Sequence, residues 1–307
     1  MIGIIGIIIL VSNSRNYVLK YEKKNLIGTL YEAELPVDSL CVATNPITLD
    51  GFETEDEFHA ISIMNLSENN ILHADNLHER LYPASTTKLM TVYLALKYGD
   101  LDAEIVVSEN AQDIPIDSSR AGLRIGDRIT LFDLLHGLML PSGNDAAIVV
   151  AEYISGSVDE FVKLMNEEAK LLGATNTNFV NPHGYQDENH YTTAYDLYLI
   201  FSACMEQAEF LNIISSPSYE LEITQRNDSY RVEKWLQSNW YVNGYRAEPD
   251  GVDVIGGKTG TTDEAGSCLI TLLKDEKDVS YLALIMGAES RTILYDNMDN
   301  LIQNALQ

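Results

Sequence analysis

Apolar residues follow one pattern near the two ends of the chain and a different one in its middle. Two extended apolar runs, residues 59–66 and 71–74, surround the turn-rich segment 67–70, which predicts a β-hairpin. Three more short apolar runs, separated by short gaps, predict consecutive antiparallel strands at 252–260, 267–273 and 279–287. The tail, residues 292–306, has helical spacing of its apolar positions.

The middle of the chain, from about residue 100 to 215, has a mostly helical pattern. An amphipathic helix is predicted over 161–172, where apolar residues recur at i, i+3, i+4 and i+11. Other apolar helices are predicted at 131–140, 145–154 and 193–204. The run 89–96 is apolar on nearly every face, which predicts a helix buried in the middle of the molecule. A strand is also predicted at 219–223, where the composition turns more polar.

Strands near both ends and helices between them predict one antiparallel sheet closed by distant segments. The expected fold class is α+β, an α/β/α sandwich in which helices flank the sheet, with an all-helical insertion over about residues 100–235. Residues 58–307 are expected to form this domain, with no separate C-terminal domain. Residues 15–57 are expected to be a lead or linker segment, since they are poorly patterned and end in an acidic stretch.

The first 14 residues contain a short, strongly apolar run at 2–11. This run is too short to span a bilayer, which takes ~20 residues. Its length suits the core of an export signal, although no basic residue precedes it and no A-x-A site follows. We therefore expect an export signal or anchor remnant at 1–14, through which the protein could attach to a membrane. A buried strand is the alternative.

Composition and charge exclude several classes of function. The chain has 20 Lys and Arg against 46 Asp and Glu, a net charge of −26, which argues against nucleic acid and against electrostatic binding to anionic lipid. The three cysteines, Cys41, Cys204 and Cys268, are widely spaced and form no Cys/His cluster. No metal site and no cofactor are therefore expected.

A serine and a lysine, Ser85 and Lys88, stand three residues apart at the start of the predicted buried helix. Residues at i and i+3 share a helix face, so the hydroxyl and the amine should lie within reach of each other. The positive end of the helix dipole and burial both disfavour a protonated lysine. A neutral lysine can take the proton of serine, which would make Ser85 an activated nucleophile. The alternative is a capped helix start with a surface lysine.

Two further short motifs lie at the ends of predicted elements. Ser142-Gly143-Asn144 separates two buried helices, and Lys258-Thr259-Gly260 lies on a predicted strand. Each triplet alone is more often a helix–helix turn or a strand end. The order SxxK, SxN, KTG is typical of penicillin-binding proteins and class A β-lactamases, and the three together predict a catalytic site.

Longer segments around these motifs resemble the serine-type D-alanyl-D-alanine carboxypeptidases, which are low-molecular-mass penicillin-binding proteins. The resemblance is carried by residues 83–91, 133–147, 181–184, 190–196 and 257–262. It extends over about residues 58–290 and leaves out the first 55 residues. It implies a peptidase of the bacterial cell envelope, secreted or anchored at its N-terminus. Its substrate would be the peptidoglycan stem peptide, and β-lactams would inhibit it covalently.

The resemblance also implies a role for each motif residue. Ser85 would attack the D-Ala-D-Ala bond and form an acyl-enzyme, with Lys88 as its base. Ser142 would relay a proton to the leaving amine, and Asn144 would hold Lys88 and the substrate amide. Lys258 would supply positive charge beside the relay. The residues expected to bind substrate are Thr259, Gly260, Thr261 and Arg291.

Three alternatives stay open at this point. A class A β-lactamase would need a glutamate in an E-x-x-L-N segment, and none occurs between Ser142 and Lys258. A D,D-endopeptidase that cuts cross-links would carry the same motifs. An inactive homologue that binds wall fragments is disfavoured by the intact motif residues. His183 and His190 are expected to have structural roles.

Overall fold

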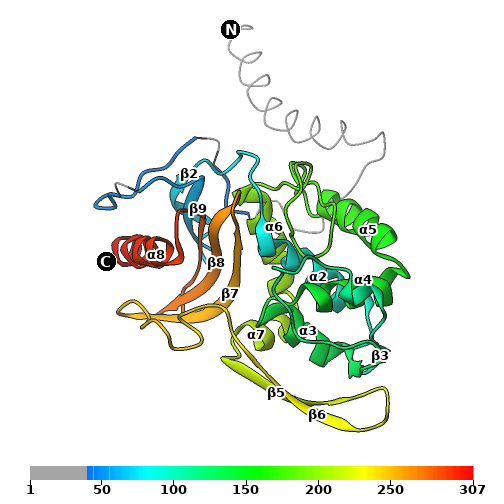
Figure 1. Ribbon diagram of the computed structural model, residues 1–307. Helices are drawn as coiled ribbons and strands as arrows, with labels where there is room; N and C mark the ends of the chain where they lie inside the picture. The colour runs from blue at the N-terminus through cyan, green and yellow to red at the C-terminus, as the bar shows by residue number, and fades with distance from the viewer. Residues whose placement is uncertain (1–39, 44, 55, 307) are drawn as a thin grey trace, which may run out of the picture.

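The computed structural model describes residues 40–43, 45–54 and 56–306, and a five-stranded antiparallel sheet lies at its centre (Figure 1). The strand order across the sheet is β2-β1-β9-β8-β7. The strands are β1 (Ala60–Asn65), β2 (Asn70–Asp75), β7 (Val252–Thr262), β8 (Gly266–Asp275) and β9 (Ser280–Ala288). Ile63 of β1 lies opposite Ala283 of β9. The prediction that segments from both ends of the chain form one sheet is therefore confirmed.

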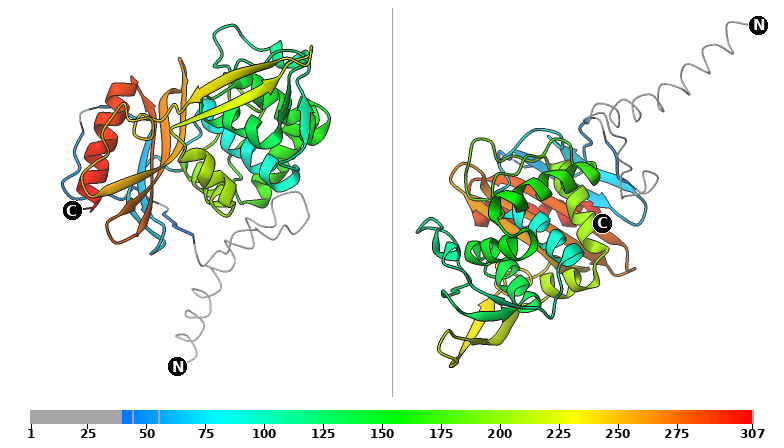
Figure 2. Two further views of the ribbon diagram at one scale, coloured as in Figure 1. Left: turned by 90° about the horizontal axis from the view of Figure 1, so that it is seen from below. Right: turned by 90° about the vertical axis from the view of Figure 1, so that its right-hand side faces the viewer.

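Helices cover both faces of this sheet (Figures 1 and 2). The C-terminal helix α8 (Arg291–Leu306) packs on one face, in a core that includes Ile61 and Ile63 of β1. On the other face, Ala60 and Met64 of the same strand join the core of the remaining helices. Because both faces are buried, the strands are apolar at nearly every position, and their period of two is hidden in the sequence.

The helical part of the molecule surrounds α2 (Lys88–Tyr98), which contacts every α-helix from α3 to α7. The other helices are η2 (Ala84–Thr87), η3 (Asn110–Gln112), α3 (Leu131–Met139), α4 (Asn144–Ser155), α5 (Val158–Leu171), α6 (Ala194–Met205) and α7 (Ala208–Ile214). The side chains of residues 88–95 are all buried, as the apolar pattern predicted. The other predicted helices are present within three residues of the expected bounds, and α7 is an addition.

Local capping explains where three of these helices begin. The hydroxyls of Thr130, Ser157 and Thr193 each accept a hydrogen bond from the backbone N–H three residues on, at the starts of α3, α5 and α6. Each acceptor satisfies a backbone donor that has no partner inside the helix. An acidic residue also lies in the first turn of each helix, where the helix dipole favours negative charge.

The insertion is not entirely helical, which corrects one expectation. It contains a second, four-stranded sheet with the order β3-β4-β5-β6. These strands are β3 (Glu104–Val106), β4 (Arg128–Thr130), β5 (Ser218–Thr224) and β6 (Tyr230–Leu236). Strands of three residues are too short to show a period. In β6 the pattern is inverted, because Tyr230 and Val232 are exposed while Arg231 points inward and pairs with Asp127 at 2.6 Å.

The described part of the lead segment packs against the domain. Ile47 bridges to Ala74 of β2, and Phe52 joins the core beneath α8. The apolar run at 1–14 lies outside the described residues. Within the part of the chain that the structure describes, no single helix is long and apolar enough to cross a membrane. The pair α6 and α7, bent by 110°, meets that test together by length and composition alone.

Candidate active site

Ser85 lies in the single-turn helix η2, directly before the buried helix α2. The residue before it, Ala84, has a left-handed backbone with φ of +46°. The carbonyl of Ala84 accepts a hydrogen bond from the Thr87 hydroxyl at 2.8 Å, and that hydroxyl in turn contacts His190 Nε2 at 2.8 Å. These contacts hold the turn in a conformation that a non-glycine residue rarely adopts.

Lys88 begins α2, and its amine is fully buried among three oxygens. Nζ lies 2.9 Å from Ser85 Oγ, 2.7 Å from Asn144 Oδ1 and 2.7 Å from the carbonyl oxygen of His183. The last two oxygens only accept, so they use the two N–H groups of a neutral amine. A neutral amine with these two partners would direct its lone pair toward the Ser85 hydroxyl, whereas an ammonium would donate to that oxygen.

The charge state of Lys88 agrees with this geometry. Burial, and then the positive charge of Lys258, lower the pKa of the Lys88 amine well below its usual value, while Asp145 raises it. A lysine in such an environment is neutral at a lower pH than one in water. The lowered pKa thus favours the neutral amine, which is the form that can accept a proton from Ser85.

A second serine–lysine pair is formed by Ser142 and Lys258. Ser142 lies in the break between α3 and α4, with a left-handed φ of +62°, and its hydroxyl accepts from Lys258 Nζ at 2.9 Å. Lys258 also donates to the carbonyl of Thr259 at 2.8 Å. Burial, and then the charge of Arg291, lower the pKa of Lys258 to about 7. The Lys258 side chain can thus change between ammonium and neutral amine near neutral pH.

Strand β7 lies beside η2, and among the described residues it is the last strand of the sheet, paired on its β8 side. A Cβ at Gly260 would lie 2.9 Å from the backbone nitrogen of Ser85. The strand therefore passes close to the amide of Ser85, and a side chain at this position would push the two apart. The hydroxyl of Thr259, the residue that follows Lys258, contacts the Ser238 hydroxyl at 2.8 Å.

Three separate parts of the chain, residues 85–88, 142–144 and 258–261, thus come together. Ser85, Lys88 and Asn144 form one group of contacts, and Ser142 and Lys258 form the other. The structure places Thr259, Gly260 and Thr261 on β7. Arg291 is the first residue of α8; it is exposed, and its charge acts on Lys258 without a direct contact to the motif residues.

The sequence signature of the D-alanyl-D-alanine carboxypeptidase peptidases matches residues 53–290 of this chain. The chain belongs to that family. Among curated members, it is 35% identical to DacF of Bacillus subtilis over 252 residues, or 78% of this chain and 61% of DacF. It is 34% identical to DacA of Haemophilus influenzae over 232 residues, or 73% of this chain and 56% of that protein.

Solved structures of the D-alanyl-D-alanine carboxypeptidase family and its kin have the same fold. The Streptomyces K15 DD-transpeptidase superimposes with a TM-score of 0.75 at 28% identity, over 82% of this chain and 99% of that one. Penicillin-binding protein 5 from Haemophilus influenzae superimposes with a TM-score of 0.70 at 30% identity, over 82% and 71%. The predicted family and the α/β/α class are thereby confirmed. The chain spans about 60% of the length of the curated relatives above.

The two histidines of the family-like segments make structural contacts. His183 Nδ1 accepts from the N–H of Tyr185 at 3.1 Å, and His190 Nδ1 accepts from the N–H of Val180 at 3.1 Å. Burial lowers the pKa of His183 to about 3 and that of His190 to about 4, so both rings are neutral. Sequence reasoning missed the contribution of the His183 carbonyl, which only the resemblance of residues 181–184 could have indicated.

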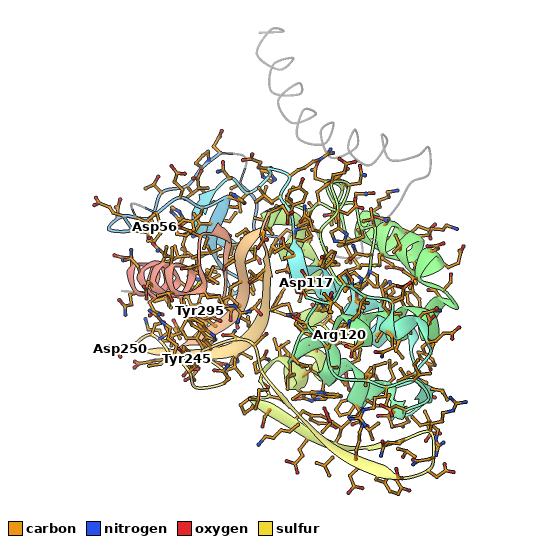
Figure 3. All side chains as sticks on the ribbon, in the orientation of Figure 1. Asp56, Asp117, Arg120, Tyr245, Asp250 and Tyr295 are labelled. Carbon is orange, nitrogen blue, oxygen red and sulfur yellow. The ribbon has the colours of Figure 1, made fainter. Side chains whose placement is uncertain are left out.

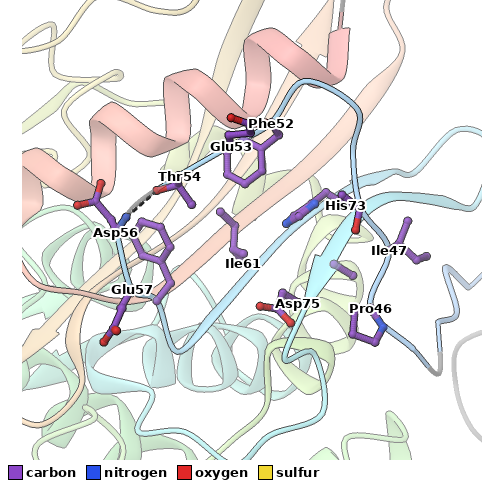
Figure 4. Close-up of a pocket in the computed structure, with 13 residues that line it drawn as sticks. Pro46, Ile47, Phe52, Glu53, Thr54, Asp56, Glu57, Ile61, His73 and Asp75 are labelled. Carbon is purple, nitrogen blue, oxygen red and sulfur yellow. Dashed lines mark hydrogen bonds between the residues drawn. The ribbon is translucent and has the colours of Figure 1, made fainter.

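Side chains on the two faces of the sheet, and a cavity at its β2 edge, complete the surroundings of the site. Asp117 and Arg120 lie on the helical side of the sheet, whereas Tyr295 of α8 lies on the opposite side (Figure 3). A cavity of about 940 Å³ opens at the β2 edge of the sheet, and its lining includes Pro46, Phe52, Glu57, His73 and Asp75 (Figure 4). This edge is the one opposite β7, and none of the predicted site residues lines the cavity.

Proposed function

We propose that this protein is a serine D,D-carboxypeptidase that removes the terminal D-alanine from peptidoglycan stem peptides. The observation that carries the proposal is the environment of Lys88, whose buried amine lies 2.9 Å from the hydroxyl of Ser85 and has a pKa lowered well below its usual value. A nucleophile and its base must lie within hydrogen-bond reach, and this pair does. The activity named for the curated relatives supports the same substrate class.

In the acylation step, Ser85 Oγ attacks the carbonyl carbon of the penultimate D-alanine. Its proton passes to the lone pair of Lys88 Nζ as the Oγ–C bond forms. The carbonyl oxygen becomes an oxyanion, which the backbone N–H groups of Ser85 and Thr261 would stabilise. Donors of this kind contribute about 3–4 kcal/mol each to transition-state stability. The close approach of Gly260 to the Ser85 nitrogen supports this placement of the two donors.

In the next step, the C–N bond to the terminal D-alanine breaks and the leaving amine takes the proton that Lys88 accepted, so that Lys88 becomes neutral again. Ser142 would relay that proton, and its hydroxyl accepts a hydrogen bond from Lys258 Nζ at 2.9 Å. Lys258, Thr259 and Arg291 would bind the terminal carboxylate, since two positive charges and a hydroxyl gather at that end of the site. Water then hydrolyses the ester and frees Ser85.

Replacing Ser85 by alanine tests the proposal directly. Wild-type protein should release D-alanine from a diacetyl-Lys-D-Ala-D-Ala peptide and should bind labelled penicillin covalently. The Ser85→Ala variant should lose both activities, with a fall in kcat of about 10⁶-fold, because it removes the hydroxyl that lies within hydrogen-bond distance of Lys88. Enzymatic detection of D-alanine and gel fluorescence measure the two results. Wild-type protein that binds the peptide without releasing D-alanine would instead be an inactive homologue.

The lifetime of the penicillin adduct separates the carboxypeptidase from a β-lactamase. The adduct on Ser85 should persist for many minutes, because the chain lacks the glutamate segment that activates a deacylating water in class A enzymes. Rapid release of hydrolysed drug would favour the β-lactamase. Comparing the pentapeptide with a cross-linked dimer as substrate separates the carboxypeptidase from a D,D-endopeptidase.

The pH dependence of turnover should report the two buried lysines. We expect kcat/KM to rise with pH as Lys88 loses its proton, and to fall above pH about 7 as the Lys258 ammonium is neutralised. In the substrate complex the carboxylate stabilises the ammonium, so the alkaline limb of kcat should lie at higher pH. The measurement is both parameters across the pH range in which the protein stays folded.

The Lys258→Arg variant is the control for this profile. Its guanidinium keeps the positive charge at every accessible pH, so the alkaline limb should disappear. An alkaline limb that survives in this variant would assign the ionisation to another group. A limb at the same pH in kcat and kcat/KM would contradict contact between Lys258 and the substrate carboxylate.

We also propose that the protein acts outside the cytoplasm, where the peptidoglycan stem peptide is found. The family membership supports this placement. β-Lactams would be covalent inhibitors, because they react with the same activated serine. Attachment to the membrane through residues 1–14 stays a prediction, since these residues lie outside the described part of the chain.

A further inference from the structure

Asp145 is a buried carboxylate beside the Ser142-Gly143-Asn144 turn, and only 1% of the residue is exposed. Oδ1 accepts from the N–H of Ala121 at 2.7 Å, and Oδ2 accepts from those of Gly122 at 2.9 Å and Leu123 at 3.1 Å. Successive backbone N–H groups that converge in this way form an anion-binding concavity. The carboxylate therefore binds residues 119–123 to the N-terminus of α4.

The turn that carries Asn144 rests directly against this loop. The N–H of Asn144 donates to the carbonyl of Ser119 at 2.8 Å. A Cβ at Gly143 would lie 2.8 Å from the nitrogen of Ala121 and 2.8 Å from Asp145 Oδ1. Loop and turn thus touch with no space for a side chain, so a shift of the loop would move the side chain of Asn144, whose oxygen accepts from Lys88.

The other side of the loop is held by the hairpin β5–β6. Trp235 Nε1 donates to the carbonyl of Ala121 at 2.8 Å, and Arg231 donates to the carbonyl of Gly122 at 3.1 Å. The N–H groups of residues 121–123 therefore bond to α4, while the carbonyls of Ala121 and Gly122 bond to the hairpin. On the α4 side, the carboxylate of Asp145 makes the attachment by accepting hydrogen bonds from three backbone N–H groups of the loop.

We propose that Asp145 is a positioning residue of the active site, which fixes residues 119–123 against α4 and thereby holds Asn144 on the amine of Lys88. The inference rests on the proposed role of Lys88 as the base. Asp145 would not touch substrate, and it acts through Asn144 and through its charge.

The charge of Asp145 gives the proposal a second readout. The charged and titratable groups that act on Lys88 from the surrounding elements are Lys258, His183, His190 and Asp145. Asp145 supplies the negative charge in this set, and it raises the pKa of Lys88 against the effects of burial and Lys258. Removing that charge should lower the pKa of Lys88 further, so that the amine becomes neutral at lower pH.

The test is the rate of acylation by labelled penicillin as a function of pH, in wild-type protein and in Asp145→Asn. The side-chain amide of this variant has one acceptor oxygen where the carboxylate has two, so it cannot accept hydrogen bonds from all three N–H groups of the loop. Displacement of a positioned catalytic group commonly lowers the rate by about 10²-fold. We therefore expect a maximum acylation rate about 10²-fold lower, and an acid limb shifted to lower pH than in wild type.

Two matched variants separate positioning from a loss of folding. Asp145→Glu keeps the charge but adds a methylene, so its rate should fall while its acid limb stays at the wild-type pH. Asp196→Asn removes another buried carboxylate, which accepts from the N–H of Asn176 at 2.8 Å and from the Thr177 hydroxyl at 2.7 Å. It should lower the melting temperature and leave the acid limb in place.

The outcomes that overturn the inference are specific. Asp145→Asn with a wild-type acylation rate would exclude positioning. So would a loss of rate that disappears after correction for the folded fraction while the acid limb stays in place. A limb that moves to higher pH would exclude the electrostatic effect of the carboxylate on Lys88. A wild-type protein that fails to react with penicillin would contradict the proposed function, which the Ser85→Ala comparison decides separately.

Discussion

Replacement of Lys88 by methionine is expected to lower kcat/KM for D-alanine release by about 10²–10⁴-fold, the usual contribution of a general base. Methionine has nearly the length of lysine and suits a fully buried position. The substitution therefore keeps the volume of the side chain and removes only the amine. Ser85 would stay in place without a group that takes its proton.

A second lysine on the same helix provides the control for that experiment. Lys97 lies in the last turn of α2 and pairs with Glu168 at 3.0 Å, away from Ser85. Lys97→Met should keep wild-type turnover, and circular dichroism should show that both variants are folded. If Lys88→Met retained more than a tenth of the wild-type kcat/KM, another group would have to be the base.

Replacement of Gly184 by alanine is expected to lower the free energy of unfolding by about 2–5 kcal/mol and to remove acylation by penicillin. The new Cβ would lie 1.8 Å from the carbonyl oxygen of Ala84 and 2.8 Å from the Thr87 hydroxyl. Gly184 also has a φ of +86°, which a residue with a Cβ tolerates poorly. Relief of the overlap must displace the turn that holds Ser85.

The matched control is Gly173→Ala, at a glycine with nearly the same backbone. Its φ is +83°, but the nearest atom to a new Cβ is 3.7 Å away. This variant should show only the conformational effect, about 1–2 kcal/mol, with unchanged acylation. Urea denaturation and penicillin labelling measure both variants. Equal losses of stability and activity at the two sites would mean that contact with Ala84 is unimportant.

The sequence predicted most of the large sheet and the long helices, because these elements combine length with a strong apolar pattern. It did not predict β6, where Tyr230 and Val232 face solvent and Arg231 points inward. The hairpin uses its inner face to bind Asp127 and the loop of residues 119–123, so polar side chains take positions that a binary pattern assigns to apolar ones.

The candidate site was predictable to a similar extent and for a related reason. The roles proposed for Ser85, Lys88, Ser142, Asn144 and Lys258 belong to their side chains, which a sequence motif records. Other contributions come from the backbone. They are the carbonyl of His183, the N–H groups that donate to Asp145, and the close approach of Gly184 to Ala84. Any residue type has a carbonyl and an N–H, so these contributions became visible only when the chain was folded.

The pairing of β1 with β9 determines when this site can exist during synthesis. Residues 60–65 pair with residues 281–286, so more than 200 residues must leave the ribosome between one strand and its partner. Until then the hairpin β1–β2 has an open edge, and a sheet built from such distant segments closes slowly. Strand β7 cannot take its place beside Ser85 before β8 and β9 are present. A truncated or partly folded chain would therefore contain Ser85 and Lys88 without strand β7 beside them.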